Sequence, residues 1–154
     1  TAVETCAAAG IHGNCTWIMA YPGEALQHLK TSVAFILWQQ QFWTKGHLPG
    51  TPDYQRLKDA VNSKMFVATA YPGTEMWRVV RKDLQKHFDI EHDSFGDPIC
   101  DDNFQRYVLE LDDATKTLNG KDGEPVNFGD IPMDQFLQAR DYVDNDQIEK
   151  ILDM

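Results

Sequence analysis

One tetrapeptide occurs twice in this chain, and the spacing of its two copies constrains the fold more than any other feature. Residues 20–23 read Ala-Tyr-Pro-Gly, and the same four residues return at 70–73. Without a gap, the same offset aligns Gly46 with Gly96 and Gln55-Arg56 with Gln105-Arg106. Several matches in one register favour duplication of a supersecondary unit. We therefore predict two helix–loop–helix copies, spanning residues 20–64 and 70–114.

The apolar spacing in the first copy is helical. Leucine, valine and isoleucine recur every three or four residues after residue 24, which predicts a helix with an apolar face. Gly46 stands where a left-handed C-cap would end this helix. Thr51-Pro52-Asp53 combines an N-cap hydroxyl, a proline and an acid, and therefore predicts the start of a second helix. The face of that helix would carry Tyr54, Leu57, Val61 and Met65.

The second copy repeats the pattern. A helix after residue 73 would place apolar side chains on one side, namely Met76, Trp77, Val80, Leu84 and Phe88. A polar loop would then lead to a fourth helix opened by Asp101-Asp102. Two helix pairs can bury their inner faces against each other as a four-helix assembly. The repeated tyrosines, Tyr21 and Tyr71, either pack under the following helices or line one ligand site at the pseudo-twofold axis.

The two ends of the chain have a different texture. Residues 1–16 are small and aperiodic and are expected to form an arm. Asn-Gly and Asp-Gly pairs within 115–129 predict a β-hairpin, and residues 130–154 predict one or two further helices. The expected fold is one all-α domain, with a duplicated helical hairpin as a pseudo-twofold four-helix core and a small C-terminal β-hairpin.

The charge of the chain bears on its partners. At 154 residues the formal net charge is −10, and negative charge repels phosphate groups. We therefore expect neither a nucleic acid nor a membrane as a partner. The longest apolar run, residues 33–38, is far shorter than the ~20 residues that cross a bilayer.

Three cysteines are too few for a disulfide-dense scaffold. Cys6 and Cys15 are separated by eight residues and could close a small loop in an oxidising compartment, which would leave Cys100 unpaired. We predict this disulfide, which would also remove Cys15 from any nucleophilic role beside His12. Thr1 suits either a processed export precursor or an engineered N-terminus. Together these features favour a secreted or periplasmic protein, with a cytoplasmic one as the alternative.

One segment is dense in potential metal ligands. It contains His87, Asp89, Glu91, His92 and Asp93, whose imidazole and carboxylate groups could hold a divalent cation. A metal-dependent enzyme, for example a hydrolase, is therefore one functional hypothesis. The spacing matches no established metal motif, and a solvated acidic loop explains the same residues. No other cofactor is indicated, and no catalytic motif is present.

Aromatic side chains concentrate in the duplicated region. Phe35, Trp38 and Phe42 form a second apolar stripe on the first helix, beside the stripe needed for a helical core. We expect this stripe either to be covered by another part of the chain or to bind a partner or ligand. The leading hypothesis is a non-catalytic binding or accessory protein that holds a partner protein or a small apolar ligand. Its predicted site consists of Tyr21, Phe35, Trp38, Phe42, Trp43, Tyr71 and Trp77.

Overall fold

The computed structural model describes residues 1–13, 15–61, 63–71, 73–80, 94, 120, 123 and 125–154. The chain divides into two compact units. Unit one consists of Thr1–Trp17, Leu26–Met65 and Leu137–Met154, and unit two of Ile18–Ala25 and Phe66–Phe136. Each unit is described separately below.

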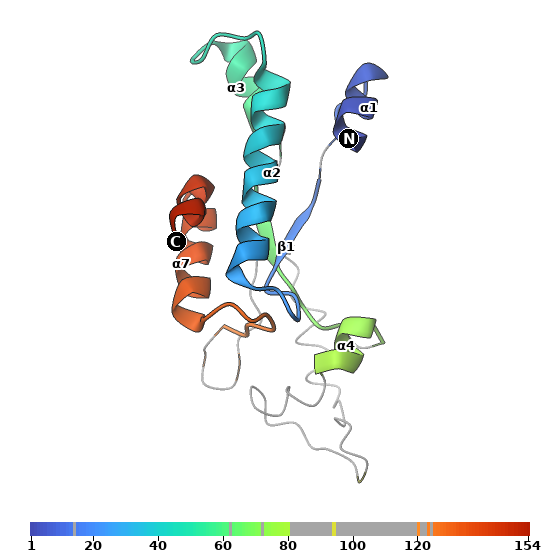
Figure 1. The fold of residues 1–154 in the computed structure, drawn as a ribbon, viewed down its shortest axis with the longest axis vertical. Coiled ribbons are helices and arrows are strands. Elements are labelled where there is room, and N and C mark those ends of the chain that lie inside the picture. Colours follow the sequence, from blue (N-terminus) through green and yellow to red (C-terminus); the bar gives the residue numbers. More distant parts are fainter. Residues whose placement is uncertain are drawn as a thin grey trace. The chain divides into compact units, whose positions relative to one another are not determined.

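Helix α2, Leu26–Thr44, is the longest described element of unit one (Figure 1). Its buried face carries Leu29, Val33 and Ile36, each 0% exposed, which confirms the helix that the apolar spacing predicts. Gly46, with φ +87°, lies just beyond the end of the helix, in the left-handed region that glycine adopts without steric cost.

Helix α3, Pro52–Asp59, folds back against the C-terminal end of α2 (Figure 1). The Thr51 hydroxyl accepts a hydrogen bond from the Tyr54 N–H, as the cap prediction requires. The predicted extension of this helix to Met65 is wrong, because Met65 begins a strand. The backbone at Met65 pairs with a segment that is distant in the sequence, and local periodicity does not reveal such a pairing.

The C-terminal region contains the two helices that the sequence predicts. Helix α7 spans Met133–Asp144, and a 3₁₀-helix, η1, spans Ile148–Asp153. Within unit one, η1 packs against α2, and the Lys30 Nζ donates a hydrogen bond to the Met154 carbonyl at 2.9 Å. Ile148 and Ile151 are buried. The N-cap residue of η1 is Gln147.

The N-terminal arm contains a helix that the aperiodic sequence does not reveal. Helix α1 spans Ala2–Ala8 and begins with a capping box. In it the Glu4 N–H donates to the Thr1 hydroxyl, while the Glu4 carboxylate accepts from the Thr1 amine. The expected arm is therefore partly ordered, since alanine has the highest helix propensity.

Two short strands form a two-stranded sheet, which corrects the all-α prediction. Strands β1, Trp17–Met19, and β2, Met65–Val67, are parallel, and the Ala68 N–H donates to the Met19 carbonyl at 2.9 Å. Parallel strands need a long crossover connection, and the segment containing α2 and α3 supplies it. The first helical hairpin is therefore the crossover of a parallel strand pair.

The predicted C-terminal β-hairpin is also wrong. In the described part of 115–129, the Gly123 N–H donates to the Gly120 carbonyl at 3.0 Å, and Gly123 has φ +79°. These features are those of a turn, as the glycine pairs suggest. No strand flanks the turn among the described residues of that segment, since both described strands lie in the N-terminal half of the chain. Turn chemistry alone does not specify strand pairing.

The described residues of the two copies of the repeated tetrapeptide share several features. Each follows a strand, and each ends in a glycine with positive φ, +82° at Gly23 and +87° at Gly73. The Glu24 N–H donates to the Tyr21 carbonyl, and the Thr74 N–H donates to that of Tyr71. A helix follows each copy, α2 in the first and α4, Glu75–Val80, in the second. The repeated local structure is therefore strand–turn–helix.

Only part of the predicted duplication can be compared. The expected fourth helix, residues 101–114, and the positions of Leu84 and Phe88 lie outside the described residues. The predicted pseudo-twofold four-helix core is replaced by the mixed architecture above. Met76 and Val80 of α4 are buried with Ala68 and Ala70, and Trp77 packs against them together with Phe128. This cluster is the apolar face predicted for the start of the second copy.

Candidate functional site: an aromatic ladder on helix α2

Aromatic side chains form a continuous ladder along one side of α2. We use "ladder" for Trp17, Phe35, Trp38, Phe42 and Trp43. Successive ring centroids lie 5.7 Å apart for Trp17–Phe35, 5.2 Å for Phe35–Trp38, 5.5 Å for Trp38–Phe42 and 5.4 Å for Phe42–Trp43. These separations are typical of attractive aromatic pairs. All five residues belong to unit one.

Helix geometry explains why the ladder forms. Phe35, Trp38 and Phe42 are spaced by three and four residues, so their side chains follow one another on one side of α2. Trp38 stacks on Phe42 with an angle of 26° between the ring planes, whereas Trp43 meets Phe42 edge-on at 80°. All members of the ladder are half-buried. The ladder thus retains some solvent-accessible aromatic surface.

The N-terminal segment supplies contacts along one border of the ladder. The His12 ring lies against the Trp43 ring, with centroids 4.3 Å apart and an interplanar angle of 30°. Trp17 contacts Phe35 nearer the start of α2. Between these two contacts, the Gln39 Nε2 donates a hydrogen bond to the Cys15 Sγ at 3.5 Å. His12, Cys15 and Trp17 therefore border part of the aromatic stripe, for which the sequence left both an internal and an external cover open.

Two indole N–H groups in the ladder have unsatisfied hydrogen-bonding potential. The Nε1 atoms of Trp17 and Trp43 are buried and have no hydrogen-bond partner among the described residues. A buried donor without an acceptor costs about 1–3 kcal/mol. Both atoms belong to side chains at the border between α2 and the N-terminal segment.

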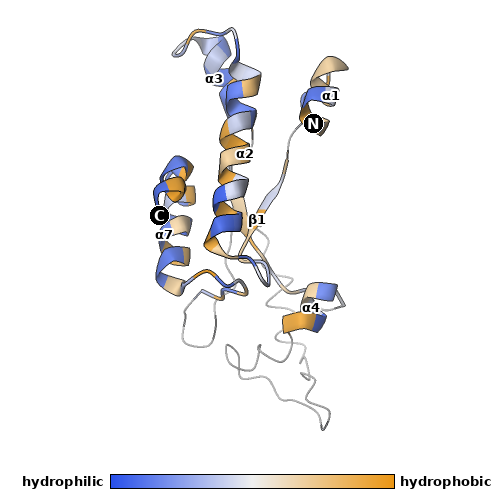
Figure 2. Ribbon diagram, in the orientation of Figure 1, coloured by the Kyte–Doolittle hydropathy of each residue, from blue (hydrophilic) through white to orange (hydrophobic). Residues whose placement is uncertain are grey.

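The exposed surroundings of the ladder are unusual for an acidic protein. Residues 25–52 contain two lysines and no Asp or Glu, although the chain as a whole has 24 acidic residues. On α2, the exposed residues three or four positions from ladder members are Thr31, Ala34 and Gln41. Apolar bands recur along α2 in Figure 2. The surface that α2 contributes around the ladder is therefore aromatic, nearly uncharged and free of carboxylates.

The structure unites only part of the predicted binding site. Four predicted residues, Phe35, Trp38, Phe42 and Trp43, belong to the ladder. Tyr21, Tyr71 and Trp77 belong to unit two instead. Tyr21 and Tyr71 are 49% and 43% exposed, so neither tyrosine packs fully under its following helix. Trp77 packs in the Ala68 cluster.

Sequence reasoning omitted two members of this site, Trp17 and His12. Both precede α2, and no periodic pattern links them to it. The only available signal was the general richness of the region in aromatic residues. Their contacts with Phe35 and Trp43 are tertiary.

The predicted Cys6–Cys15 disulfide is wrong. Both cysteines are free and half-buried, and the Cys15 sulfur accepts the hydrogen bond from Gln39. Helix α1 accounts for the difference at Cys6, because it fixes that residue in regular structure. The eight-residue spacing permits the two ends to meet but does not require it.

The predicted metal ligands His87, Asp89, Glu91, His92 and Asp93 lie outside the described residues. Elsewhere, the described ranges contain no group of three or more His, Cys, Asp or Glu side chains arranged to hold a metal ion. Among the helices that the structure describes, none is both long and apolar enough to cross a membrane. No protein-family model, curated protein or solved structure matches this chain.

Proposed function

We propose that this protein is a non-catalytic binding protein whose aromatic ladder on α2 accepts a segment of a partner polypeptide. The observation that carries the proposal is the continuous ring contact from Trp17 to Trp43 in side chains that are all only half-buried. Core aromatic residues are usually enclosed more completely, whereas interface residues combine packing with access.

The composition of the face supports an interface. Protein interfaces are enriched in tryptophan, phenylalanine and tyrosine at their centre and depleted there in charged residues. Trp38 and Phe42 are bordered by small or uncharged side chains such as Ala34 and Gln41. A carboxylate would have to lose its hydration on partner binding, and residues 25–52 contain none.

The shape of the face favours a polypeptide over a small apolar ligand. From Phe35 to Trp43 the ladder extends along α2 for about 12 Å, at 1.5 Å per residue. A linear apolar stripe matches the side chains of another helix, which recur every three or four residues. Small-molecule sites are instead concave and enclose most of the ligand.

Paired substitutions in the ladder test this function. Partners captured from the source on immobilised protein would be identified, and each would be measured for its Kd against the purified wild type. We expect the Trp38→Ala/Phe42→Ala variant to bind at least about tenfold more weakly, as hot-spot aromatic residues do. Tyr54→Ala is the matched control, because Tyr54 is a half-buried aromatic residue of α3 outside the ladder.

The stability of each variant separates binding from folding. Thermal unfolding of both variants should remain cooperative, so that a weaker Kd reports the surface itself. Unchanged binding by a folded Trp38→Ala/Phe42→Ala variant would overturn the proposal. In that case the ladder would serve only to hold the N-terminal segment against α2.

A further inference from the structure

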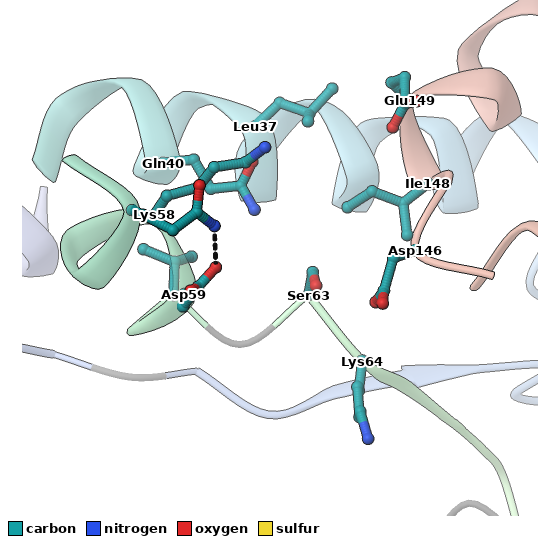
Figure 3. Close-up of a pocket in the computed structure, with 11 residues that line it drawn as sticks. Leu37, Gln40, Lys58, Asp59, Ser63, Lys64, Asp146, Ile148 and Glu149 are labelled. Carbon is teal, nitrogen blue, oxygen red and sulfur yellow. Dashed lines mark hydrogen bonds between the residues drawn. The ribbon is translucent and has the colours of Figure 1, made fainter. Parts of the chain in front are cut away.

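A pocket of about 390 Å³ lies in unit one, on another side of α2 from the ladder. It is bordered by α2, α3, the segment after α3, and the start of η1 (Figure 3). Gln40 lines the pocket. It is nearly opposite Phe42 around the axis of α2, because side chains two positions apart on an α-helix differ in direction by about 200°. The pocket is therefore independent of the proposed polypeptide site.

Three apolar side chains contribute to the lining of the pocket. Leu37 from α2, Val61 after α3 and Ile148 from η1 all line it. Val61 and Ile148 are 5% and 4% exposed, so their positions are fixed by the core of unit one. Such a surface suits a short aliphatic chain.

Charged side chains stand on two sides of the pocket. Asp146 and Glu149 approach from the side of η1, and Lys58 from α3. Figure 3 shows the α3 residues and the η1 residues on opposite sides of the pocket. Within the described chain, no ion pair engages any of these three side chains. Their charges remain available to a ligand.

Two further charged residues, Asp59 and Lys64, belong to the lining. The Asp59 carboxylate accepts a hydrogen bond from Gln55 Nε2 at 2.6 Å, drawn as the dashed line in Figure 3. The Lys64 ammonium is directed away from Asp146 and Ser63 (Figure 3). The η1 side thus carries two carboxylates, and the ammonium of Lys58 lies on the opposite side, beside the Asp59 carboxylate.

We propose that this pocket binds a linear zwitterion, an ω-amino carboxylate with an aliphatic chain between its two charges. The ligand's ammonium lies between Asp146 and Glu149, its methylene groups contact Val61 and Ile148, and its carboxylate faces Lys58. A ligand with only one charge leaves one end of the pocket unmatched. Because Asp146 and Glu149 both carry carboxylates, the η1 side of the pocket favours the ammonium group of the ligand.

The backbone at Asp146 makes a clean test possible. Asp146 has φ +55°, a left-handed conformation that asparagine adopts more readily than other side-chain-bearing residues. Asp146→Asn therefore removes the charge without a change in backbone geometry. Asp144→Asn is the matched control, because Asp144 is an exposed acid at the end of α7 that does not line the pocket.

The experiment is an NMR titration that follows the methyl signals of Val61 and Ile148. The probes are β-alanine, γ-aminobutyrate and ε-aminocaproate, with hexylamine and hexanoate as singly charged analogues. We expect the affinity to peak at one chain length, with a Kd of about 0.1–1 mM, as partly exposed ion pairs support. Asp146→Asn and Lys58→Met should each weaken the best probe by about fivefold, and Asp144→Asn should have no effect.

Three results would overturn the inference. Hexylamine binding as tightly as the best zwitterion would show that the site recognises a cation alone. Equal binding by wild type and Asp146→Asn, with Asp146→Asn folded by its methyl spectrum, would remove the carboxylate contact. Absence of methyl shifts with every probe would show that the pocket holds only water. None of these results depends on the aromatic ladder.

Discussion

The Gln39 side-chain amide, 1% exposed, donates a hydrogen bond from its Nε2 to the sulfur of Cys15 at 3.5 Å. This contact joins the middle of α2 to the N-terminal segment, between the two aromatic contacts that His12 and Trp17 make. Sulfur is a weak acceptor, but a buried amide that loses its acceptor is costly. The pair therefore positions the segment that borders the aromatic ladder.

A double-mutant cycle should reveal this coupling. Cys15→Ala removes the acceptor and leaves the Gln39 amide unsatisfied, so we expect it to destabilise the protein by about 1–2 kcal/mol. Gln39→Leu in the same background should recover much of that loss, since no buried donor remains. Urea unfolding of the two single variants and the double variant measures the cycle. Additive effects would show that the two side chains are not coupled.

Both cysteines of the N-terminal region should carry free thiols. The structure leaves Cys6 and Cys15 half-buried and unbridged. Alkylation of the unfolded protein without reductant, followed by peptide mass spectrometry, should therefore label both residues completely. If Cys6 and Cys15 were alkylated only after reduction, the result would contradict the structure and support the predicted disulfide.

Ladder and core positions of α2 should differ in their contribution to stability. Ile36 is 0% exposed, so Ile36→Ala should cost about 2–5 kcal/mol. Trp38 is half-buried, and we expect Trp38→Ala to cost less than the ~3–5 kcal/mol typical of a fully buried aromatic residue. Chemical denaturation of the two variants compares them directly. A larger loss at Trp38 than at Ile36 would identify the ladder as core.

A side chain at Gly129 should destabilise the protein, because Gly129 lies against the first copy of the repeated turn. A Cβ at this position would approach the Glu24 carbonyl to 3.0 Å and the Tyr21 carbonyl to 3.2 Å. Next to it, the Asp130 N–H donates to the Glu24 carbonyl at 2.8 Å. Gly129→Ala would force these backbone segments apart, at a cost of about 1–3 kcal/mol.

Gly46→Ala provides the comparison for that steric effect. A Cβ at Gly46 meets no atom within 4 Å, and the positive φ is the only obstacle. We expect a loss of about 1 kcal/mol, from the left-handed backbone alone. Thermal unfolding of both variants separates the two causes. An equal and small loss at Gly129 would show that its close approach to the turn is not rigid.

The sequence determined those helices whose signals lie within a few neighbouring residues. The spacing of Leu29, Val33 and Ile36 specifies the buried face of α2, and Thr51-Pro52 specifies the start of α3. The same is true of α7, opened after Asp130 and Pro132. Helical hydrogen bonds join residues four apart, so their signals lie within a few residues of each other.

Only the tertiary structure decided the features that depend on distant segments. A strand of three residues, such as Trp17–Met19, is too short to show a periodic pattern in the sequence. It pairs with Met65–Val67, and α2 and α3 lie between the two strands in the sequence. The contacts of Trp17 and His12 with α2 likewise join residues with no local relationship. The sequence identified a surplus aromatic stripe on α2. Which chain segment borders it, and how much of it stays accessible, depend on side-chain packing between segments, which local patterns do not encode.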